Sequence, residues 1–167
     1  IMHKNAPGGN GYRLMVNSSQ KLSFSINNSV FNSGSAVIEY NRWYHVAWVV
    51  SASGGSSLYI NGNLDAFYGS SGTPAANPEN VYIGRGLKGN IDELRVYKFE
   101  RSVVDIKKCM YESMDDANAP AGDCFVFNFD GSAWAQKNFQ YFTLHGNTFF
   151  SNTAAISSTS SPLVRAD

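Results

Sequence analysis

The amino-acid sequence predicts an all-β protein, an antiparallel two-sheet sandwich of the jelly-roll kind with one short helix near residues 102–110. Three observations favour this fold class. Apolar or alternating segments of strand length recur between residues 12 and 97, and turns rich in Ser, Gly and Asn separate them. The apolar residues Val103, Ile106 and Met110 have the spacing of one helix face. Many short strands joined by polar turns are typical of sandwiches and jelly rolls.

The predicted strands begin with a hairpin. Residues 12–16 and 21–26 alternate in hydrophobicity on either side of a polar turn at 17–20. Residues 43–50 are apolar on both faces, which predicts a central strand packed on two sides. Asn61 and Gly62 favour a type I′ turn, in which both central residues have positive φ. The remaining predicted strands are residues 58–60, 64–68, 81–83, 91–97 and 125–130.

The predicted helix follows these strands. Ser102 and Asp105 have the spacing of a capping box, in which each side chain accepts a backbone N–H of the other residue. Val103, Ile106 and Met110 would share one helix face.

Composition indicates a secreted β protein. Charged residues make up 16% of the chain, against about 25% in ordinary soluble domains, and Ser, Asn, Gly and aromatic residues take their place. The formal net charge is zero, so no global field attracts nucleic acid or an anionic membrane. No apolar run approaches the roughly 18 residues of a membrane span.

The cysteines, Cys109 and Cys124, lie close together in the sequence. A disulfide between them would stabilise the fold by about 3 kcal/mol, and two buried thiols are the alternative. A zinc site is not expected, because two cysteines cannot complete one and His3, His45 and His145 are scattered.

Four segments carry a resemblance to a known family. The sequence NRWYHVA at 41–47 resembles a "W-x-H-v-A" strand, and LYING at 58–62 resembles an "LYvNG" hairpin. The segment at 83–97 resembles "iGr…f.G.iDEvriY", and the segment at 4–14 resembles "K…gYrL". In this order they resemble laminin-G-like, or concanavalin-A-like, jelly-roll domains over about residues 2–108. The resemblance implies an extracellular sandwich that binds glycans or proteins, sometimes with calcium and usually without catalysis.

The resemblance also implies a domain organisation. Family domains place several strands before the "K…gYrL" segment, so residues 1–110 are predicted to be a jelly-roll domain that lacks its first strands. Residues 111–167 are predicted to be a disulfide-closed loop followed by C-terminal strands, with a linker at 151–162. These strands either complete the sandwich by folding back or open a second repeat. We favour the fold-back, because leaving Phe125, Phe127 and Phe129 exposed would forgo roughly 1.5–3 kcal/mol each.

The acidic residues do not predict a catalytic pair. Glycosidases need two carboxylates facing one cleft, whereas the neighbours Asp92 and Glu93 would point to opposite faces of a strand. Asp92 is expected to be a partly buried carboxylate that accepts backbone N–H groups, with calcium binding as an alternative. The acidic loop at 115–120 departs from an EF-hand at Pro120 and Ala121, so a solvated loop is expected. We predict no enzymatic activity, and the metal assignment stays open.

Two further features concern sugars. Asn17-Ser18-Ser19 and Asn27-Asn28-Ser29 are N-glycosylation sequons in predicted turns, which predicts glycans on Asn17, Asn27 or both. Several aromatic residues are candidates for a sugar-stacking platform, and the sequence does not choose among them. They are Tyr40, Trp48, Tyr59, Tyr68 and Tyr82.

These observations predict a non-catalytic structural or adhesive module of a surface protein or filament, located outside the cell or at its surface. Its partners would be extracellular proteins, glycans or copies of itself. The alternative is a lectin-like, glycan-binding domain. No cofactor is certain, and calcium is a candidate ion.

Overall fold

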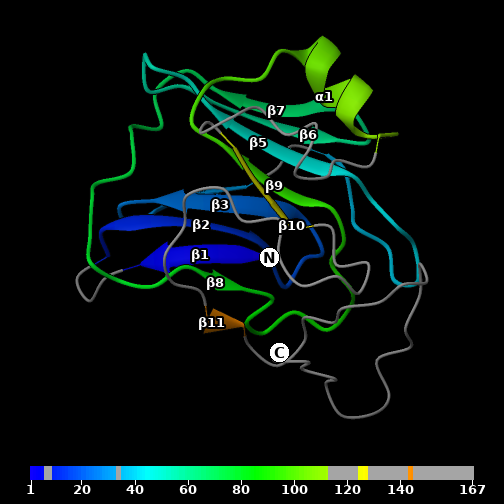
Figure 1. The fold of residues 1–167 in the computed structure, drawn as a ribbon, viewed down its shortest axis with the longest axis horizontal. Coiled ribbons are helices and arrows are strands. Elements are labelled where there is room, and N and C mark those ends of the chain that lie inside the picture. Colours follow the sequence, from blue (N-terminus) through cyan, green and yellow to red (C-terminus); the bar gives the residue numbers. More distant parts are fainter. Residues whose placement is uncertain (6–8, 33–34, 113–123, 128–142, 145–167) are drawn as a thin grey trace. The chain divides into compact units, whose positions relative to one another are not determined.

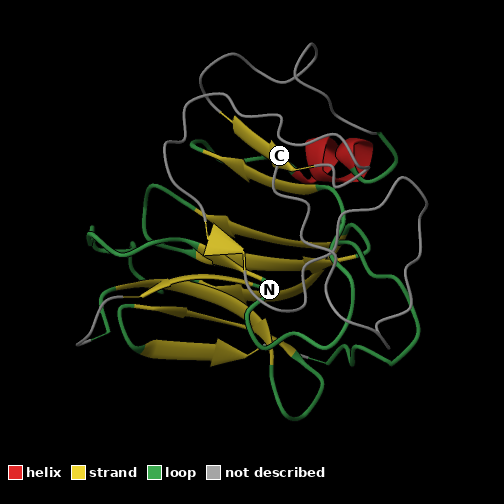
Figure 2. Cartoon of the chain, turned by 60° about the horizontal axis from the view of Figure 1, so that its bottom comes forward, coloured by secondary structure: helices red, strands yellow, loops and turns green. Residues whose placement is uncertain are grey.

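The computed structural model describes residues 1–5, 9–32, 35–112, 124–127 and 143–144 (Figure 1). The chain divides into two compact units. The larger unit comprises residues 2–79 and 100–112, and the smaller comprises residues 80–99 and 113–167 together with Ile1. Strands dominate the described residues, and one short helix accompanies them (Figure 2). The all-β prediction is confirmed.

The first sheet of the larger unit is an antiparallel meander in the order β1-β2-β3-β4. The Asn17 side chain stabilises the turn between β2 and β3, since its Oδ1 accepts the N–H groups of Ser19 and Lys21. Asn27 and Asn28 form the next turn with φ of 45° and 78°, values that Asn tolerates well. The strands are β1 (Met2–Asn5), β2 (Gly11–Val16), β3 (Leu22–Ile26) and β4 (Ser29–Asn32).

The second sheet of the larger unit is an antiparallel meander of β5 (Val46–Val50), β6 (Ser56–Ile60) and β7 (Asn63–Tyr68). The predicted turn at Asn61 and Gly62 is present, with φ of 50° and 72°. The prediction for residues 43–50 was partly wrong. The strand begins at Val46, and β5 lies at one end of this three-stranded sheet instead of at its centre.

The two sheets pack face to face around Phe24 of β3. Its ring stacks on Trp48 of β5 with 4.9 Å between centroids, and on Phe31 of β4 with 4.7 Å. Tyr68 of β7 meets the Phe24 ring edge-on at 5.5 Å. Phe24 and Leu58 are fully buried. Aromatic contacts between facing strands therefore hold the larger unit together. Figure 1 shows β1, β2 and β3 of this unit in one layer and β5, β6 and β7 in another, as in a two-sheet sandwich.

The smaller unit contains β8 (Tyr82–Ile83), β9 (Leu94–Tyr97), β10 (Cys124–Phe127) and β11 (Thr143–Leu144). The segment predicted at 91–97 becomes a strand only from Leu94, because Glu93 has a φ of +50° that interrupts the extended backbone. The β8–β11 pair is parallel, unlike the antiparallel pairing predicted for residues 81–83.

The strand β10 pairs antiparallel with β9, so a segment beyond the predicted helix returns to pair with an earlier strand. Phe129 and residues 151–162 lie outside the described residues, and the domain assignment for 111–167 remains a prediction.

The helix α1 (Val103–Cys109) begins with the predicted capping box of Ser102 and Asp105. Ile106 is buried, whereas Val103, expected on the same face, is 42% exposed. The helix lies against the β6–β7 turn, where a Cβ on Gly62 would come within 2.9 Å of Lys107 Cγ. None of the helices in the described part of the chain is long and apolar enough to span a bilayer.

Candidate functional site

The aromatic candidates from the sequence separate clearly in the structure. Trp48 and Tyr68 belong to the core around Phe24. Tyr59 is half-buried, and Tyr82 carries the Arg85 guanidinium 5.2 Å from its ring centre. Tyr40 differs from these because it is 77% exposed. Of the five candidates, Tyr40 is therefore the one with a ring largely open to a ligand.

A second exposed ring lies close to Tyr40 in the sequence. Trp43 is 57% exposed in the segment that precedes β5. The surface position of Trp43 was not predicted, because the apolar pattern of residues 43–50 indicates a buried strand. The signal that could have found it is Asn41, a residue type that readily adopts positive φ and does so here at +60°. We call residues 39–44 the aromatic loop.

Short-range hydrogen bonds hold the aromatic loop in shape. The backbone N–H of Glu39 donates to the Tyr44 hydroxyl at 3.2 Å. The Arg42 guanidinium contacts the Glu39 carboxylate, with 2.5 Å between Nη1 and Oε2. With the left-handed backbone of Asn41 between them, these contacts close a turn that leaves Tyr40 and Trp43 facing solvent.

Hydrogen bonds also anchor both ends of the aromatic loop to the sandwich. Before the loop, the N–H of Ile38 donates to the Gln20 carbonyl at 2.7 Å, in the turn between β2 and β3. After it, His45 and Asn61 exchange two hydrogen bonds. The His45 N–H donates to Asn61 Oδ1 at 2.9 Å, and the Asn61 N–H donates to the His45 carbonyl at 2.7 Å. The loop is thus fixed to both sheets.

The chemistry of the aromatic loop suits a flat, partly apolar ligand. Covering an exposed ring such as that of Trp43 gains roughly 1.5–3 kcal/mol, and Tyr and Trp also have polar groups that can hydrogen-bond a hydroxyl. The hydrogen bond that Arg42 donates to Glu39 raises the pKa of Arg42, and the nearby Glu39 charge adds to this effect. Arg42 therefore stays cationic in the segment of the loop that joins Tyr40 to Trp43.

The acidic pair considered from the sequence does not form a shared site. Asp92 is exposed, and its Oδ1 accepts the Glu93 N–H at 2.9 Å. The backbone hydrogen bond agrees with the expectation for Asp92, but the partial burial does not. Glu93 Oε2 lies 2.7 Å from Nη2 of Arg95, whose side chain is 8% exposed. An arginine thus neutralises one of the two carboxylates.

The structure gives no metal centre among its described residues, since nowhere in them do three His, Cys, Asp or Glu side chains gather closely enough to hold an ion. The acidic loop at 115–120 lies outside the described residues. Calcium binding therefore remains untested.

The sequons have different surroundings. Asn17 is half-buried in the β2–β3 turn, followed by the exposed Ser18 and Ser19. Asn27 is exposed by area, yet both ends of its side-chain amide are hydrogen-bonded. Its Oδ1 accepts the N–H groups of Gly11 and Ala75, and its Nδ2 donates to the Thr73 carbonyl. Asn27 therefore acts as a junction of the fold.

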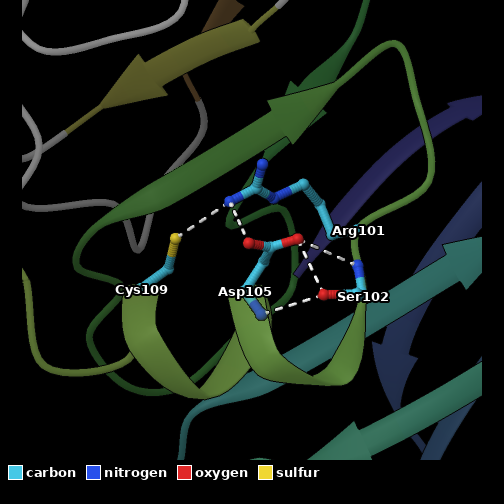
Figure 3. Close-up of polar contacts among 4 residues, drawn as sticks. All are labelled: Arg101, Ser102, Asp105 and Cys109. Carbon is cyan, nitrogen blue, oxygen red and sulfur yellow. Dashed lines mark hydrogen bonds and ion pairs between the residues drawn. The ribbon is translucent and has the colours of Figure 1, made fainter.

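Cys109 lies at the end of α1 beside a small charged cluster (Figure 3). The Arg101 Nη2 atom is 3.5 Å from Cys109 Sγ and 3.8 Å from Asp105 Oδ1. Ser102 Oγ donates to Asp105 Oδ2 at 2.8 Å, and the Asp105 N–H donates back at 3.1 Å. The side chain of Cys124 is outside the described part, so the Cys109–Cys124 disulfide remains a prediction.

A family model described as the Concanavalin A-like lectin/glucanases superfamily matches residues 1–107. The chain belongs to this superfamily. The match confirms the laminin-G-like, concanavalin-A-like resemblance found in the sequence. The superfamily takes its name from lectins and glucanases alike, so membership settles the fold and not the choice between binding and catalysis. Among curated proteins, none matches the chain.

Two solved structures are similar to this superfamily member. The first is a Bacteroides ovatus protein proposed to bind carbohydrate, with 22% identity and a TM-score of 0.57. That match covers 82% of this chain and 42% of the other, so the chain spans less than half of that protein. The second is an S-layer domain-containing protein from Clostridium thermocellum, with 22% identity and a TM-score of 0.34. It covers 61% of this chain and 57% of the other. At these identities the first likeness concerns the fold alone.

Proposed function

We propose that this chain is a non-catalytic carbohydrate-binding module that works outside the cell or at its surface, with the aromatic loop as its binding surface. The observation that carries the proposal is the exposure of Tyr40 and Trp43 on a loop anchored at both ends. Aromatic rings held in place before binding lose little conformational freedom when a sugar stacks on them. Membership of a superfamily named for lectins, and a fold shared with a protein proposed to bind carbohydrate, support the same function.

The contacts of Asp92 and Glu93 support a non-catalytic role. A retaining or inverting glycosidase needs one carboxylate as acid and a second as nucleophile or base. Glu93 forms an ion pair with the largely buried Arg95, which favours a structural use of its charge. Asp92 accepts the N–H of its own neighbour.

Binding to a polysaccharide panel tests this proposal. Trp43→Ala and Tyr40→Ala should each weaken binding about ten- to a hundredfold, because the lost contact area is worth roughly 1.5–3 kcal/mol and 1.4 kcal/mol corresponds to a factor of ten. Tyr111→Ala is the matched control, because Tyr111 is an 84% exposed ring outside residues 39–44. Repeating the measurement with EDTA tests the calcium alternative. Equal affinities for all variants would rule out the aromatic loop as the binding surface.

A structural or adhesive module, the function favoured by the sequence, remains the second candidate. Leu64 and Phe67 of β7 are 58% and 67% exposed, and they pair across the sheet with Tyr59 and Ser57. Cross-strand partners share a face, so these residues give the sheet a partly apolar outer surface. Sedimentation of the wild type and of a Leu64→Ser/Phe67→Ser variant tests this candidate. Concentration-dependent association that the double substitution abolishes would support it.

A further inference from the structure

The aromatic loop contains a charged group that stacking on a neutral sugar would not use. Arg42 precedes Trp43 directly and follows Tyr40 by two positions, and its side chain is 65% exposed. Its described hydrogen bond is the single contact from Nη1 to Glu39. A guanidinium has five N–H donors arranged as a planar fork that matches carboxylate or sulfate oxygens. Most of the donor capacity of Arg42 is therefore open to solvent, in the same short loop as Tyr40 and Trp43.

From this arrangement we propose that the glycan bound by the aromatic loop carries an anionic group, which Arg42 binds in exchange for Glu39. The inference rests on the proposed carbohydrate-binding function and names its ligand class. The shared chemistry is an oxyanion on a sugar, either the carboxylate of a uronic acid or a sulfate ester. Tyr40 and Trp43 would stack on the sugar rings while the guanidinium binds the charged substituent.

Replacing Glu39 by a ligand anion on Arg42 is favourable, because Glu39 itself binds Arg42 only weakly. Both of its side chains are exposed, Arg42 at 65% and Glu39 at 58%. Exposed ion pairs contribute little to stability, since water and salt screen them and two long side chains must be ordered. Breaking the pair leaves Glu39 solvated, so an incoming anion does not leave a buried charge without a partner.

The competition between Glu39 and a ligand for Arg42 provides selectivity. Small anions must compete with the tethered Glu39 for Arg42. An anionic glycan competes better, because it gains stacking on Tyr40 and Trp43 at the same time. Glu39 therefore makes binding selective for ligands that offer both a charge and a ring face.

Two pairs of matched polysaccharides test the inference on the whole chain. One pair is polygalacturonate and its methyl-esterified form, and the other is dextran sulfate and dextran. Wild type should bind at least one anionic member more tightly than its neutral match, and salt should weaken that binding. Glu39→Gln should strengthen anionic binding several-fold, because the competitor is gone. Arg42→Gln should weaken it about tenfold, and it should weaken binding of the neutral member of each pair less than binding of the anionic member.

The two glycan pairs separate the possible results. Preference for polygalacturonate identifies a carboxylate ligand, and preference for dextran sulfate identifies a sulfate ligand. Anionic binding that is unchanged in both Glu39→Gln and Arg42→Gln would overturn the inference. If Trp43→Ala still abolishes binding in that case, the carbohydrate-binding function itself survives. Binding to none of the panel, or binding that ignores Trp43, overturns both. Unchanged thermal unfolding of each variant shows that the fold is intact.

Discussion

Asn27 donates a hydrogen bond from its side-chain Nδ2 to the backbone carbonyl of Thr73, at 2.8 Å. The two residues are far apart in the sequence, in the β3–β4 turn and in the loop after β7. The same amide accepts the N–H of Gly11 at 3.1 Å and that of Ala75 at 2.9 Å. One exposed side chain therefore joins β2 and the β3–β4 turn of the first sheet to the loop that follows β7.

Removing this junction should destabilise the larger unit. Asn27→Gly keeps a residue that tolerates the φ of +45° but loses the side-chain hydrogen bonds, so we expect a loss of about 1–3 kcal/mol. Asn27→Ala should cost about 1 kcal/mol more, because Ala is strained at positive φ. Urea unfolding measures both variants. An Asn27→Gly variant as stable as the wild type would show that these bonds contribute nothing net.

The same junction bears on glycosylation. A glycan on Asn27 must attach to an Nδ2 that already contacts the Thr73 carbonyl, whereas Asn17 lies in a hairpin turn with the exposed Ser18 and Ser19. We predict that a host with N-glycosylation modifies Asn17 and not Asn27. Glycosidase treatment should lower the intact mass of the wild type and of Asn27→Gln, but not that of Asn17→Gln. A mass shift that persists in Asn17→Gln would contradict the assignment.

Two phenylalanines make a matched pair for the core. Phe24 is fully buried between Trp48 and Phe31, whereas Phe67 is 67% exposed on β7. Phe24→Ala should lower the free energy of unfolding by about 3–5 kcal/mol. Phe67→Ala should change it by about 0.5 kcal/mol or less. Chemical denaturation compares them, and similar losses at the two sites would mean that the sandwich core does not centre on Phe24.

The capping box of α1 should make stability depend on acid pH. The side-chain hydrogen bond from Ser102 lowers the pKa of Asp105, and the nearby charges of Arg101 and Lys108 act in the same direction. The folded state thus favours the ionised carboxylate. Its contribution is complete above the unfolded pKa of about 3.9 and is lost as pH falls through the lower folded value. Asp105→Asn should remove this component from unfolding curves measured between neutral and strongly acid pH.

The disulfide prediction has a direct chemical test. Cys109 and Cys124 are expected to be bridged in material from an oxidising compartment. Thiol labelling of denatured, unreduced protein should then find no free cysteine, and labelling after reduction should find two. Quantitative labelling of both residues without reduction would exclude the bond. Replacing both by Ser should leave Arg101 and Asp105 paired, because their contact does not involve sulfur.

Local signals in the sequence were sufficient for most of the sandwich. The Asn61–Gly62 turn and the Ser102–Asp105 capping box were predicted because a few adjacent residues determine each of them. The parallel β8–β11 pair was not predictable in this way, since two-residue strands carry no periodic pattern and distant segments decide their pairing.

The candidate site was harder to predict than the fold. Trp43 lies in an apolar run that has the same pattern whether it is buried in a strand or exposed in a loop, and the positive φ of Asn41 decides between the two. The role of Asn27 depends on Thr73 and Ala75, which become its neighbours only after folding. Burial in the folded chain distinguishes exposed rings from core rings. Long-range contacts show that Asn27 has a structural role although it lies in a sequon.

The hydrogen bond between Ile38 and Gln20 has a consequence for any sugar that the protein itself carries. Gln20 is bonded in turn to Asn17, whose carbonyl accepts its N–H at 2.9 Å, so the sequon turn and the aromatic loop are direct neighbours. A glycan attached at Asn17 would begin at the turn to which the aromatic loop is anchored. It would act as a tethered competitor at high local concentration. Whether the loop is open to outside ligands would then depend on the cell in which the protein is made.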